Sequence, residues 1–264
     1  MNRIFVLALC LLAGRALAQL SPANDAGITF GHVHLSVSDI DVDKKLFVDA
    51  FGGTFVQKGP LLTVKFPNML IALRKGPTGP SQGSVMDHFG FKVRDIAATL
   101  QTLRTMGYEV QSEFTGAEGF PNAYVLGPDG LRIEMQEDKT LDAVAIPNHV
   151  HFWSGDYVKL LDWYIDTFSL KKRNRGTIGT TADAGTVNLS FSKSDKPVAP
   201  TKGRTIDHIG FEVRDLDAFS KRLAAKGIKL DVPVRDVPAI GLKIAFLTDP
   251  AGTYIELTEG LDKY

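Results

Sequence analysis

The chain has 264 residues, of which 44% are hydrophobic, and these values are typical of one large or two ordinary globular domains. It carries 30 basic and 30 acidic residues, so no basic surplus indicates a nucleic acid or an anionic membrane as a partner. The single cysteine excludes an intramolecular disulfide and a cysteine-rich metal site.

The first 18 residues have the pattern of a cleaved secretory signal peptide. Arg3 precedes an apolar run from Ile4 to Leu12, and Ala16-Leu17-Ala18 fits the small-x-small cleavage rule. The run is too short to span a membrane. We therefore expect a secreted or periplasmic protein with no membrane contact after cleavage. Because Cys10 lies in this segment, the mature chain is expected to contain no cysteine.

Four similar stretches recur along the rest of the chain. In each, a histidine opens a strand-like run, and an aspartate follows seven positions later, where a helical pattern begins. The stretches are residues 32–39, 88–95, 149–156 and 208–215. All six histidines fall inside them, because the first and third stretches carry a second histidine, His34 or His151. Scattered core histidines would not align in this way, so the pattern indicates a fourfold internal repeat.

The first half of the chain contains two units with the same predicted element order. In the opening strand, alternation places Val33 and Leu35 on one face and His32 and His34 on the other. The first unit predicts a strand at 28–37, a helix at 39–51 and strands at 54–58, 61–66 and 69–74. The second predicts a strand at 86–93, a helix at 95–106 and strands at 108–114, 123–126 and 131–136.

The second half repeats this order, and its third unit is less regular than its fourth. The third unit predicts a strand from residue 148, a helix at 156–168 and strands at 171–175 and 186–192, with 176–185 unassigned. The fourth predicts a strand at 206–213, a helix at 215–226 and strands at 228–234, 242–247 and 253–258. The chain is therefore predicted to be α+β, with four βαβββ modules.

These modules are expected to pair, because one apolar strand face and one helix cannot bury a core alone. Gly- and Pro-containing linkers join the modules within each half, and residues 137–146 join the halves. We therefore predict two domains of two modules, with the concave polar sheet faces available to a ligand. The N-terminal domain is expected at 28–138 (modules 28–75 and 85–137) and the C-terminal domain at 146–260 (modules 146–192 and 205–260).

Two glutamates complete a chemical pattern on the polar strand faces. Glu134 and Glu256 each stand four positions after a turn glycine, and alternation directs both toward the histidines. The predicted triads are His32, His88 and Glu134 in the first half, and His149, His208 and Glu256 in the second. Two imidazoles and one carboxylate leave coordination positions open, which suits Fe(II) oxygenase chemistry and also Zn, Mn or Ni acting as a Lewis acid.

Each of these residues also has a structural interpretation. The histidines can be hydrogen-bonded wall residues, with each glutamate paired to a neighbour such as Arg132. His34 and His151 project into the same polar space and are candidates for proton transfer or ligand support, or for wall residues that face water. Trp153 and Tyr254 are candidates for stacking on a flat ligand or for ordinary packing. His151 and Tyr254 are the predicted catalytic residues.

The modules resemble a known family, the vicinal oxygen chelate superfamily. The resemblance rests on the pattern His-x-x-(aliphatic or Phe)-x-Val-x-Asp before each helix and on Asp-Pro-x-Gly-x-x-Ile-Glu-Leu at residues 249–257. The family includes glyoxalase I, extradiol dioxygenases, methylmalonyl-CoA epimerase and the fosfomycin and bleomycin resistance proteins. The resemblance implies paired βαβββ modules that form open barrels. It also implies a divalent metal in each barrel, held by the same two triads.

This sequence departs from the residue patterns of two members of the family. Glyoxalase I takes a fourth, carboxylate ligand, and the corresponding slots here hold Ala72 and Asn188. Extradiol dioxygenases add a histidine and a tyrosine shortly before the last glutamate, but the fourth unit has Phe246 there and no histidine nearby. Tyr124 stands closer to the expected place in the second unit, also without a histidine.

Three functions are therefore weighed. The first is an exported, divalent-metal-dependent enzyme with dioxygenase-like chemistry on a small substrate, an aromatic one included, with Fe(II) favoured over Zn, Ni or Mn. The second is a glyoxalase I-like lyase or an epimerase. The third is a non-catalytic small-molecule-binding protein of the resistance type. A mixed form, in which only the C-terminal half is active, is also open. Because each predicted metal site is complete within one chain, a monomer suffices, and a homodimer is the alternative.

Overall fold

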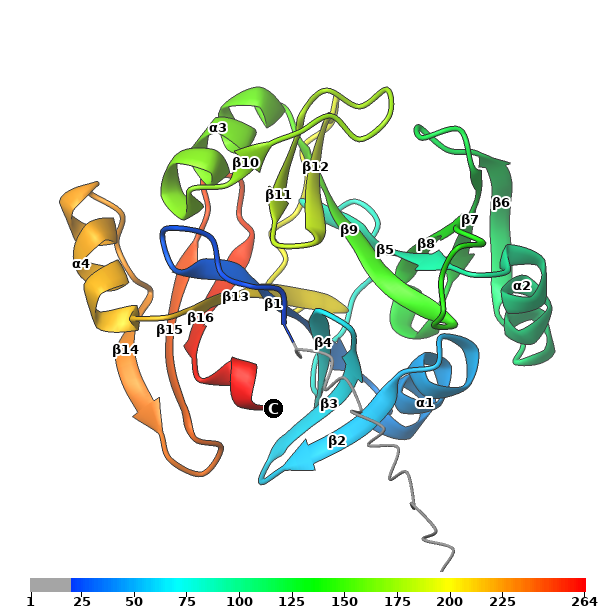
Figure 1. Ribbon diagram of the computed structural model, residues 1–264, viewed down its shortest axis with the longest axis horizontal. Coiled ribbons are helices and arrows are strands. Elements are labelled where there is room, and N and C mark those ends of the chain that lie inside the picture. The colour runs from blue at the N-terminus through cyan, green and yellow to red at the C-terminus, as the bar shows by residue number, and fades with distance from the viewer. Residues whose placement is uncertain (1–19) are drawn as a thin grey trace, which may run out of the picture.

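The structure is a computed structural model that describes residues 20–264 (Figure 1). The predicted signal peptide, residues 1–18 with Cys10, lies outside the described residues. Among residues 20–264, no helix combines the length and the apolar character needed to cross a membrane.

The first two modules have these elements in chain order. The first module contains β1 (Ile28–Val37), α1 (Ile40–Lys45), the π-helical turn η1 (Leu46–Ala50), β2 (Thr54–Lys58), β3 (Leu61–Phe66) and β4 (Met69–Lys75). The second contains β5 (Met86–Val93), α2 (Ile96–Thr105), β6 (Glu109–Thr115), β7 (Pro121–Leu126), the 3-10 turn η2 (Pro128–Gly130) and β8 (Arg132–Glu137).

The last two modules follow the same order. The third contains β9 (Ala145–Ser154), α3 (Tyr157–Phe168), β10 (Lys171–Lys172), β11 (Thr181–Ala184) and β12 (Val187–Lys193). The fourth contains β13 (Ile206–Val213), α4 (Leu216–Ala225), β14 (Val232–Val237), β15 (Leu242–Thr248), β16 (Tyr254–Glu259) and the 3-10 turn η3 (Leu261–Lys263). The segment left unassigned in the sequence, 176–185, therefore supplies the strand β11.

The modules assemble into two eight-stranded mixed sheets, which confirms the predicted α+β class. The strand orders are β14-β15-β16-β13-β1-β4-β3-β2 and β10-β11-β12-β9-β5-β8-β7-β6. In each sheet two modules meet through their first strands, which run antiparallel: β1 beside β13, and β5 beside β9.

Neighbouring modules within a half do not share a sheet. The first module shares a sheet with the fourth, and the second shares a sheet with the third. Neighbours within a half instead contact each other through their apolar, helix-covered faces. Phe51 stacks on Phe91 of the next module at 4.7 Å between ring centres, and Phe168 stacks on Phe211 at 4.1 Å. These contacts form one continuous core. Within each half, the two modules therefore bury their helix-covered faces against each other and leave their other sheet faces outside this contact.

Local sequence explains how each module begins. Val33 and Leu35 of β1 are completely buried in the core, as the alternation predicts. Three of the four repeated aspartates cap the following helix: Asp39, Asp95 and Asp215 each accept a hydrogen bond from a backbone N–H of the first turn. The recurring aspartate is therefore a structural residue that ends the strand and starts the helix.

Asp43→Asn is expected to stabilise the protein at neutral pH. Both carboxyl oxygens of Asp43 are buried without a hydrogen-bond partner among the described residues. Burial, followed by the charges of Asp129 and Asp39, raises the pKa of Asp43 to about 7. The folded state thus binds a proton more tightly than the unfolded state, so the free energy of unfolding falls as the pH rises from the ordinary pKa of aspartate toward 7.

Urea unfolding at two pH values checks this expectation. The free energy of unfolding of Asp43→Asn should exceed that of the wild type by about 2 kcal/mol near pH 8. Near pH 4 the two values should be equal, because the wild-type carboxyl is protonated there. Asp49→Asn, an exposed carboxylate in the adjoining turn η1, serves as the control and should show no such pH-dependent gain. An Asp43→Asn gain of equal size at both pH values would contradict the interpretation.

Candidate metal centres

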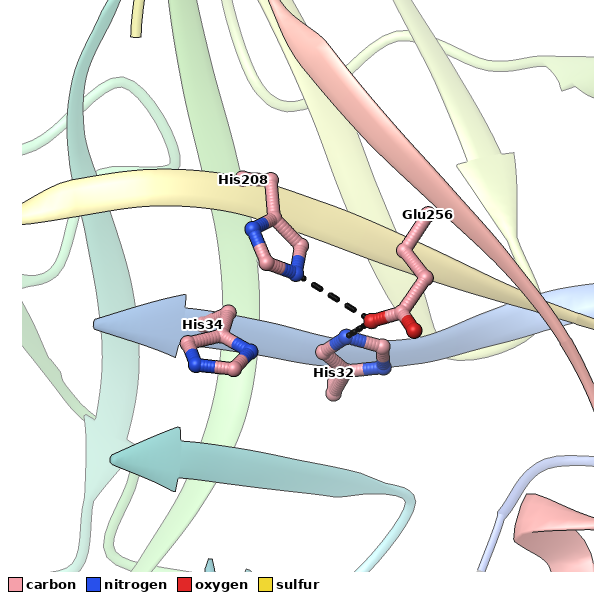
Figure 2. A group of neighbouring side chains, drawn as sticks. All are labelled: His32, His34, His208 and Glu256. Carbon is pink, nitrogen blue, oxygen red and sulfur yellow. Dashed lines mark hydrogen bonds and ion pairs between the residues drawn. The ribbon is translucent and has the colours of Figure 1, made fainter. Parts of the chain in front are cut away.

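The first cluster joins His32, His34, His208 and Glu256 (Figure 2). One potential ligand atom from each side chain lies within 4.8 Å of the others. Glu256 Oε2 lies 3.0 Å from His32 Nε2 and 3.1 Å from His208 Nε2. The rings of His34 and His208 are 4.3 Å apart between centres. Because β1 carries the first two histidines and β13 and β16 carry the other residues, the cluster combines the first and fourth modules.

Strand register brings these side chains together. In the antiparallel pair β1–β13, His34 stands opposite His208 and His32 opposite Gly210. In the parallel pair β13–β16, Gly210 stands beside Glu256. A Cβ atom at Gly210 would lie 2.0 Å from Cε1 of His32, so any side chain there would displace the His32 ring. The glycine is therefore required by the close approach of an imidazole.

In the first cluster, the surroundings favour an ionised Glu256 carboxylate and a neutral His34 imidazole. Burial raises the pKa of Glu256, but hydrogen bonds from His208 and His32 outweigh it and hold that pKa below its ordinary range. Burial, and then the charge of His208, hold the pKa of His34 well below its usual value. His34 Nε2 is buried without a hydrogen-bond partner among residues 20–264. An ionised carboxylate and an unpaired neutral nitrogen are the forms that bind a divalent cation.

A carboxylate behind His208 fixes the orientation of its ring. His208 Nδ1–H donates to Asp207 Oδ1 at 2.7 Å, which leaves Nε2 directed into the cluster. Burial lowers the pKa of His208, but the hydrogen bonds to Asp207 and Glu256 outweigh burial, so the pKa lies above its ordinary value. Metal binding at Nε2 would displace a proton at that atom.

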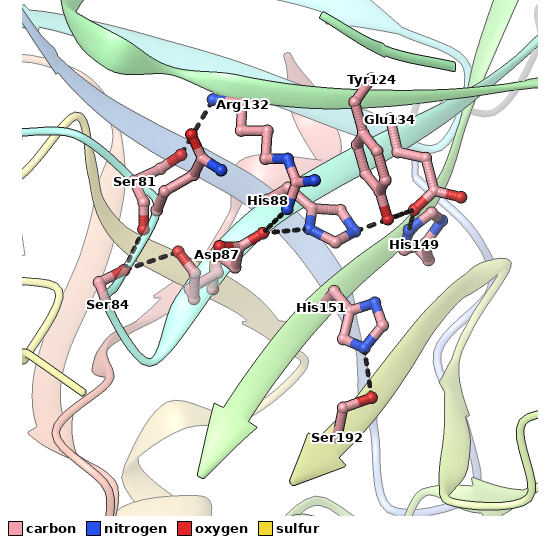
Figure 3. A network of polar contacts seen from close by, with 12 residues as sticks. Ser81, Ser84, Asp87, His88, Tyr124, Arg132, Glu134, His149, His151 and Ser192 are labelled. Atoms are coloured by element: carbon pink, nitrogen blue, oxygen red, sulfur yellow. Dashed lines mark hydrogen bonds and ion pairs between the residues drawn. The ribbon is translucent and has the colours of Figure 1, made fainter. Parts of the chain in front are cut away.

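The second cluster joins His88, Glu134, His149 and His151, all of which are buried (Figure 3). Glu134 Oε2 lies 2.9 Å from His88 Nε2 and 3.3 Å from His149 Nε2. A Cβ at Gly90 would lie 2.3 Å from His149 Cε1, the same relation that Gly210 has in the first cluster. β5, β8 and β9 carry these residues, so this cluster combines the second and third modules.

Protein groups already satisfy the carboxylate of the second cluster. Besides the bond to His88, Glu134 accepts a hydrogen bond from the Tyr124 hydroxyl at 3.0 Å (Figure 3). It also accepts one from Asn122 Nδ2 at 2.6 Å. Tyr124 stands beside Glu134 in the β7–β8 register as Phe246 stands beside Glu256 in β15–β16. Only the second cluster therefore has a hydroxyl at this position, while Glu256 accepts from histidines alone among the described residues.

A buried arginine further distinguishes the second cluster. Arg175 is 2% exposed, and its Nε donates to Ser190 Oγ at 3.2 Å. Ser190 stands opposite His151, as Ala72 stands opposite His34 in the other sheet. Burial and the Arg175 charge lower the pKa of His149 to about 4. A fixed guanidinium next to the ligands opposes the approach of a second cation, so the second cluster is the less favourable metal site.

The structure regroups the predicted triads. His32 lies with His208 and Glu256, and not with the His88 and Glu134 expected in its half. His149 correspondingly lies with His88 and Glu134 instead of His208 and Glu256. The grouping by sequence half is wrong because strands of opposite halves pair. The six predicted residues nevertheless divide into two clusters of two histidines and one glutamate, each joined by a further histidine, His34 or His151.

The two predicted catalytic residues have different surroundings. His151 Nε2 lies 2.7 Å from Ser192 Oγ (Figure 3). The His151 ring stacks on Trp153 with 5.5 Å between ring centres. Tyr254 stacks on Phe246 at 4.9 Å and meets the edge of His208 at 5.8 Å. Tyr254 therefore packs beside the first cluster, and its catalytic role, like that of His151, stays a prediction.

Two cavities adjoin the first cluster. The apolar chamber, about 140 Å³, is lined mainly by Leu61, Leu70, Ala72, Ile240, Leu242 and Leu261. The cationic mouth, about 490 Å³, is lined by Arg74, Lys202, Asp207, His208, Phe246 and Tyr254 among others. His34 and Glu256 line both cavities. No residue of the second cluster lines either one, so the first cluster has the better access for a small molecule.

The family model named Glyoxalase/Bleomycin resistance protein/Dioxygenase superfamily matches the sequence twice, over residues 29–135 and 146–257. The chain belongs to this superfamily. The match covers most of the described residues and includes both clusters, which confirms the resemblance seen in the sequence. No protein of curated function matches the chain.

Solved structures share the fold of this superfamily member at low identity. Glyoxalase I from Zea mays superposes with a TM-score of 0.68 at 17% identity and covers 89% of this chain and 94% of its own. A provisionally assigned dioxygenase from Bacillus subtilis has a TM-score of 0.65 at 14% identity and covers 92% and 86%. These similarities show the fold, and the two matches of the family model show the tandem arrangement.

Sequence reasoning missed the roles of several residues around the clusters. Asp87 and Asp207 each accept a hydrogen bond from Nδ1–H of the histidine that follows, at 2.7 Å. Their signal is the Asp-His dipeptide of the second and fourth modules, and the His-x-Gly spacing in the same modules marks the required glycines. Arg175 has no comparable signal, because it lies in a segment without a clear period.

Proposed function

We propose that the protein is a divalent-metal-dependent enzyme of the superfamily that acts on a small substrate at the first cluster, with dioxygenase-like chemistry and Fe(II) as the favoured ion. The observation that carries the proposal is a largely buried His/Glu cluster with an unpaired imidazole nitrogen and two adjoining cavities. A divalent metal there supplies a Lewis acid, and ferrous iron also supplies a centre for oxygen chemistry. The predicted signal peptide supports a reaction outside the cytoplasm.

Each residue of the first cluster has a distinct proposed part. His32, His208 and Glu256 are the ligands, and Asp207 holds the His208 ring in place from behind. His34 is the nitrogen best placed to accept a proton from a substrate, because it is neutral, has no partner for its Nε2 among residues 20–264, and borders both cavities.

One observation favours a second candidate, a non-catalytic binding protein. Phe246 occupies the position beside Glu256 where Tyr124 stands in the other cluster, so within residues 20–264 no tyrosine hydroxyl bonds to Glu256. The lyase or epimerase alternative needs a proton-transfer carboxylate, and Ala72 beside His34 provides none. Neither observation removes His34 as a proton acceptor.

Metal-dependent oxygen uptake tests the proposal. Protein loaded anaerobically with Fe(II) is expected to consume oxygen when catechol is added, and Glu256→Gln should lose this activity by about 100-fold or more because a ligand charge is removed. Glu109→Gln, an exposed glutamate of β6, is the control and should behave as the wild type. Tight binding of Zn, Ni or Mn without oxygen uptake would favour a lyase or epimerase. Retention of less than about 0.1 metal ion per chain would contradict a metalloenzyme.

A further inference from the structure

The apolar chamber has the size of a single ring. Its volume is about 140 Å³, and its walls are mostly aliphatic, with His32, His34 and Glu256 at the cluster end. An engineered apolar cavity of about 150 Å³ in another protein stays dry and binds benzene. A chamber of this size and lining therefore favours a ring-sized apolar group over water.

The cationic mouth has the opposite character. Arg74 Nη2 comes no closer than 4.0 Å to Asp207 Oδ2, which is the limit of an ion pair, and its side chain is 58% exposed. Lys202 Nζ lies 4.3 Å from the ring centre of Tyr254 and forms no ion pair within residues 20–264. Asp207 is already engaged by His208 Nδ1–H. Two cations at this opening are thus available to an anionic ligand.

The two cavities adjoin each other at the first cluster, because His34 and Glu256 line each of them. We propose that the first cluster binds an amphipathic organic anion, with a ring-sized apolar group in the apolar chamber and a carboxylate beside Arg74 and Lys202. This substrate class rests on the proposed function only in using the same cluster. The aliphatic wall excludes a second charge, so the ligand carries its anionic group at one end.

Three probe molecules separate the contribution of the anionic group from that of the ring. Titration calorimetry compares 3-phenylpropanoate with 3-phenylpropanamide, which lacks the charge, and with propanoate, which lacks the ring. The metal-loaded full chain at low ionic strength is expected to bind 3-phenylpropanoate about 10-fold or more tightly than either analogue. Added salt should weaken the binding of 3-phenylpropanoate and leave the binding of 3-phenylpropanamide unchanged. Equal affinity for the acid and its amide, or for the acid and propanoate, would overturn the proposal.

Variants assign the preference to the two cavities. The double variant Arg74→Gln, Lys202→Gln should lose the preference for acid over amide, whereas Lys229→Gln, an exposed lysine outside both cavities, should keep it. Ala72→Leu fills the apolar chamber and should remove the preference for 3-phenylpropanoate over propanoate. Because overpacking can unfold the chain, Leu61→Asn, at a partly exposed wall position, gives a second test of the same loss. An unchanged preference in the folded variants would overturn the assignment.

Metal titration distinguishes this proposal from the proposed function. Metal binding without a preference for 3-phenylpropanoate overturns the substrate class alone. A clear preference in a chain that binds no divalent metal overturns the metalloenzyme and leaves the amphipathic anion site in place.

Discussion

His32→Ala and His208→Ala are each expected to weaken divalent-metal binding at the first cluster by about 100-fold or more, and the double variant should be little weaker than either. The reason is that both histidines contact Glu256 Oε2, at 3.0 and 3.1 Å, although 176 positions separate them along the chain. Once either histidine is lost, the other contributes less to the metal affinity than it does in the complete site. Calorimetric titration with Zn²⁺ or Co²⁺ measures the coupling.

The matched comparison pairs His32→Ala with His88→Ala. These residues lie in the same sequence half but in different clusters, so their effects on metal affinity should be independent. Strong coupling between His32 and His88, together with independence of His32 and His208, would contradict the arrangement of the sheets. The comparison therefore tests the crossed pairing in solution.

Glu134→Ala is expected to destabilise the metal-free protein by about 3 kcal/mol, whereas Glu256→Ala should cost about 1 kcal/mol. Loss of the Glu134 carboxylate removes the acceptor for buried groups of Asn122, Tyr124 and His88. Glu256 accepts only from histidines among the described residues and borders the polar cationic mouth, which water can enter. Urea unfolding in the presence of a chelator measures both values.

Glu134→Gln supplies the control for this difference. It keeps an acceptor oxygen and the side-chain volume, so its cost should fall below that of Glu134→Ala. Equal costs for Glu134→Ala and Glu256→Ala would show that the hydrogen-bond network around Glu134 does not stabilise the fold. A larger loss at Glu256 would reverse the assignment of the second cluster as the more structural one.

Local patterns were sufficient to predict the modules and the residues of the clusters. The alternation that directs Val33 and Leu35 into the core directs His32 and His34 to the opposite face of the strand, and each turn glycine sets the register of the glutamate that follows. These are short-range relations, which the strand period determines. For the same reason the irregular segment around Arg175 resisted prediction, and the cation beside His149 was missed.

The partner of each module could not be predicted. All four first strands have the same pattern, and β1 is as suited to β5 as to β13, since both offer a glycine two positions after the histidine: Gly90 or Gly210. The choice depends on tertiary packing, in which rings such as Phe51 and Phe91 bury the helix faces of neighbouring modules against each other. No local feature of the sequence records that contact.

The antiparallel union of β1 with β13 and of β5 with β9 means that neither half of the chain is self-sufficient. A separated half would present the edges of two first strands without a neighbour, and edges of this kind seek another strand. Two copies of such a half, placed around a twofold axis, would reproduce both sheets and both clusters. The single chain is thus equivalent to a covalently fused dimer, in which fusion allows one centre to gain Arg175 and Tyr124 while the other keeps its open cavities.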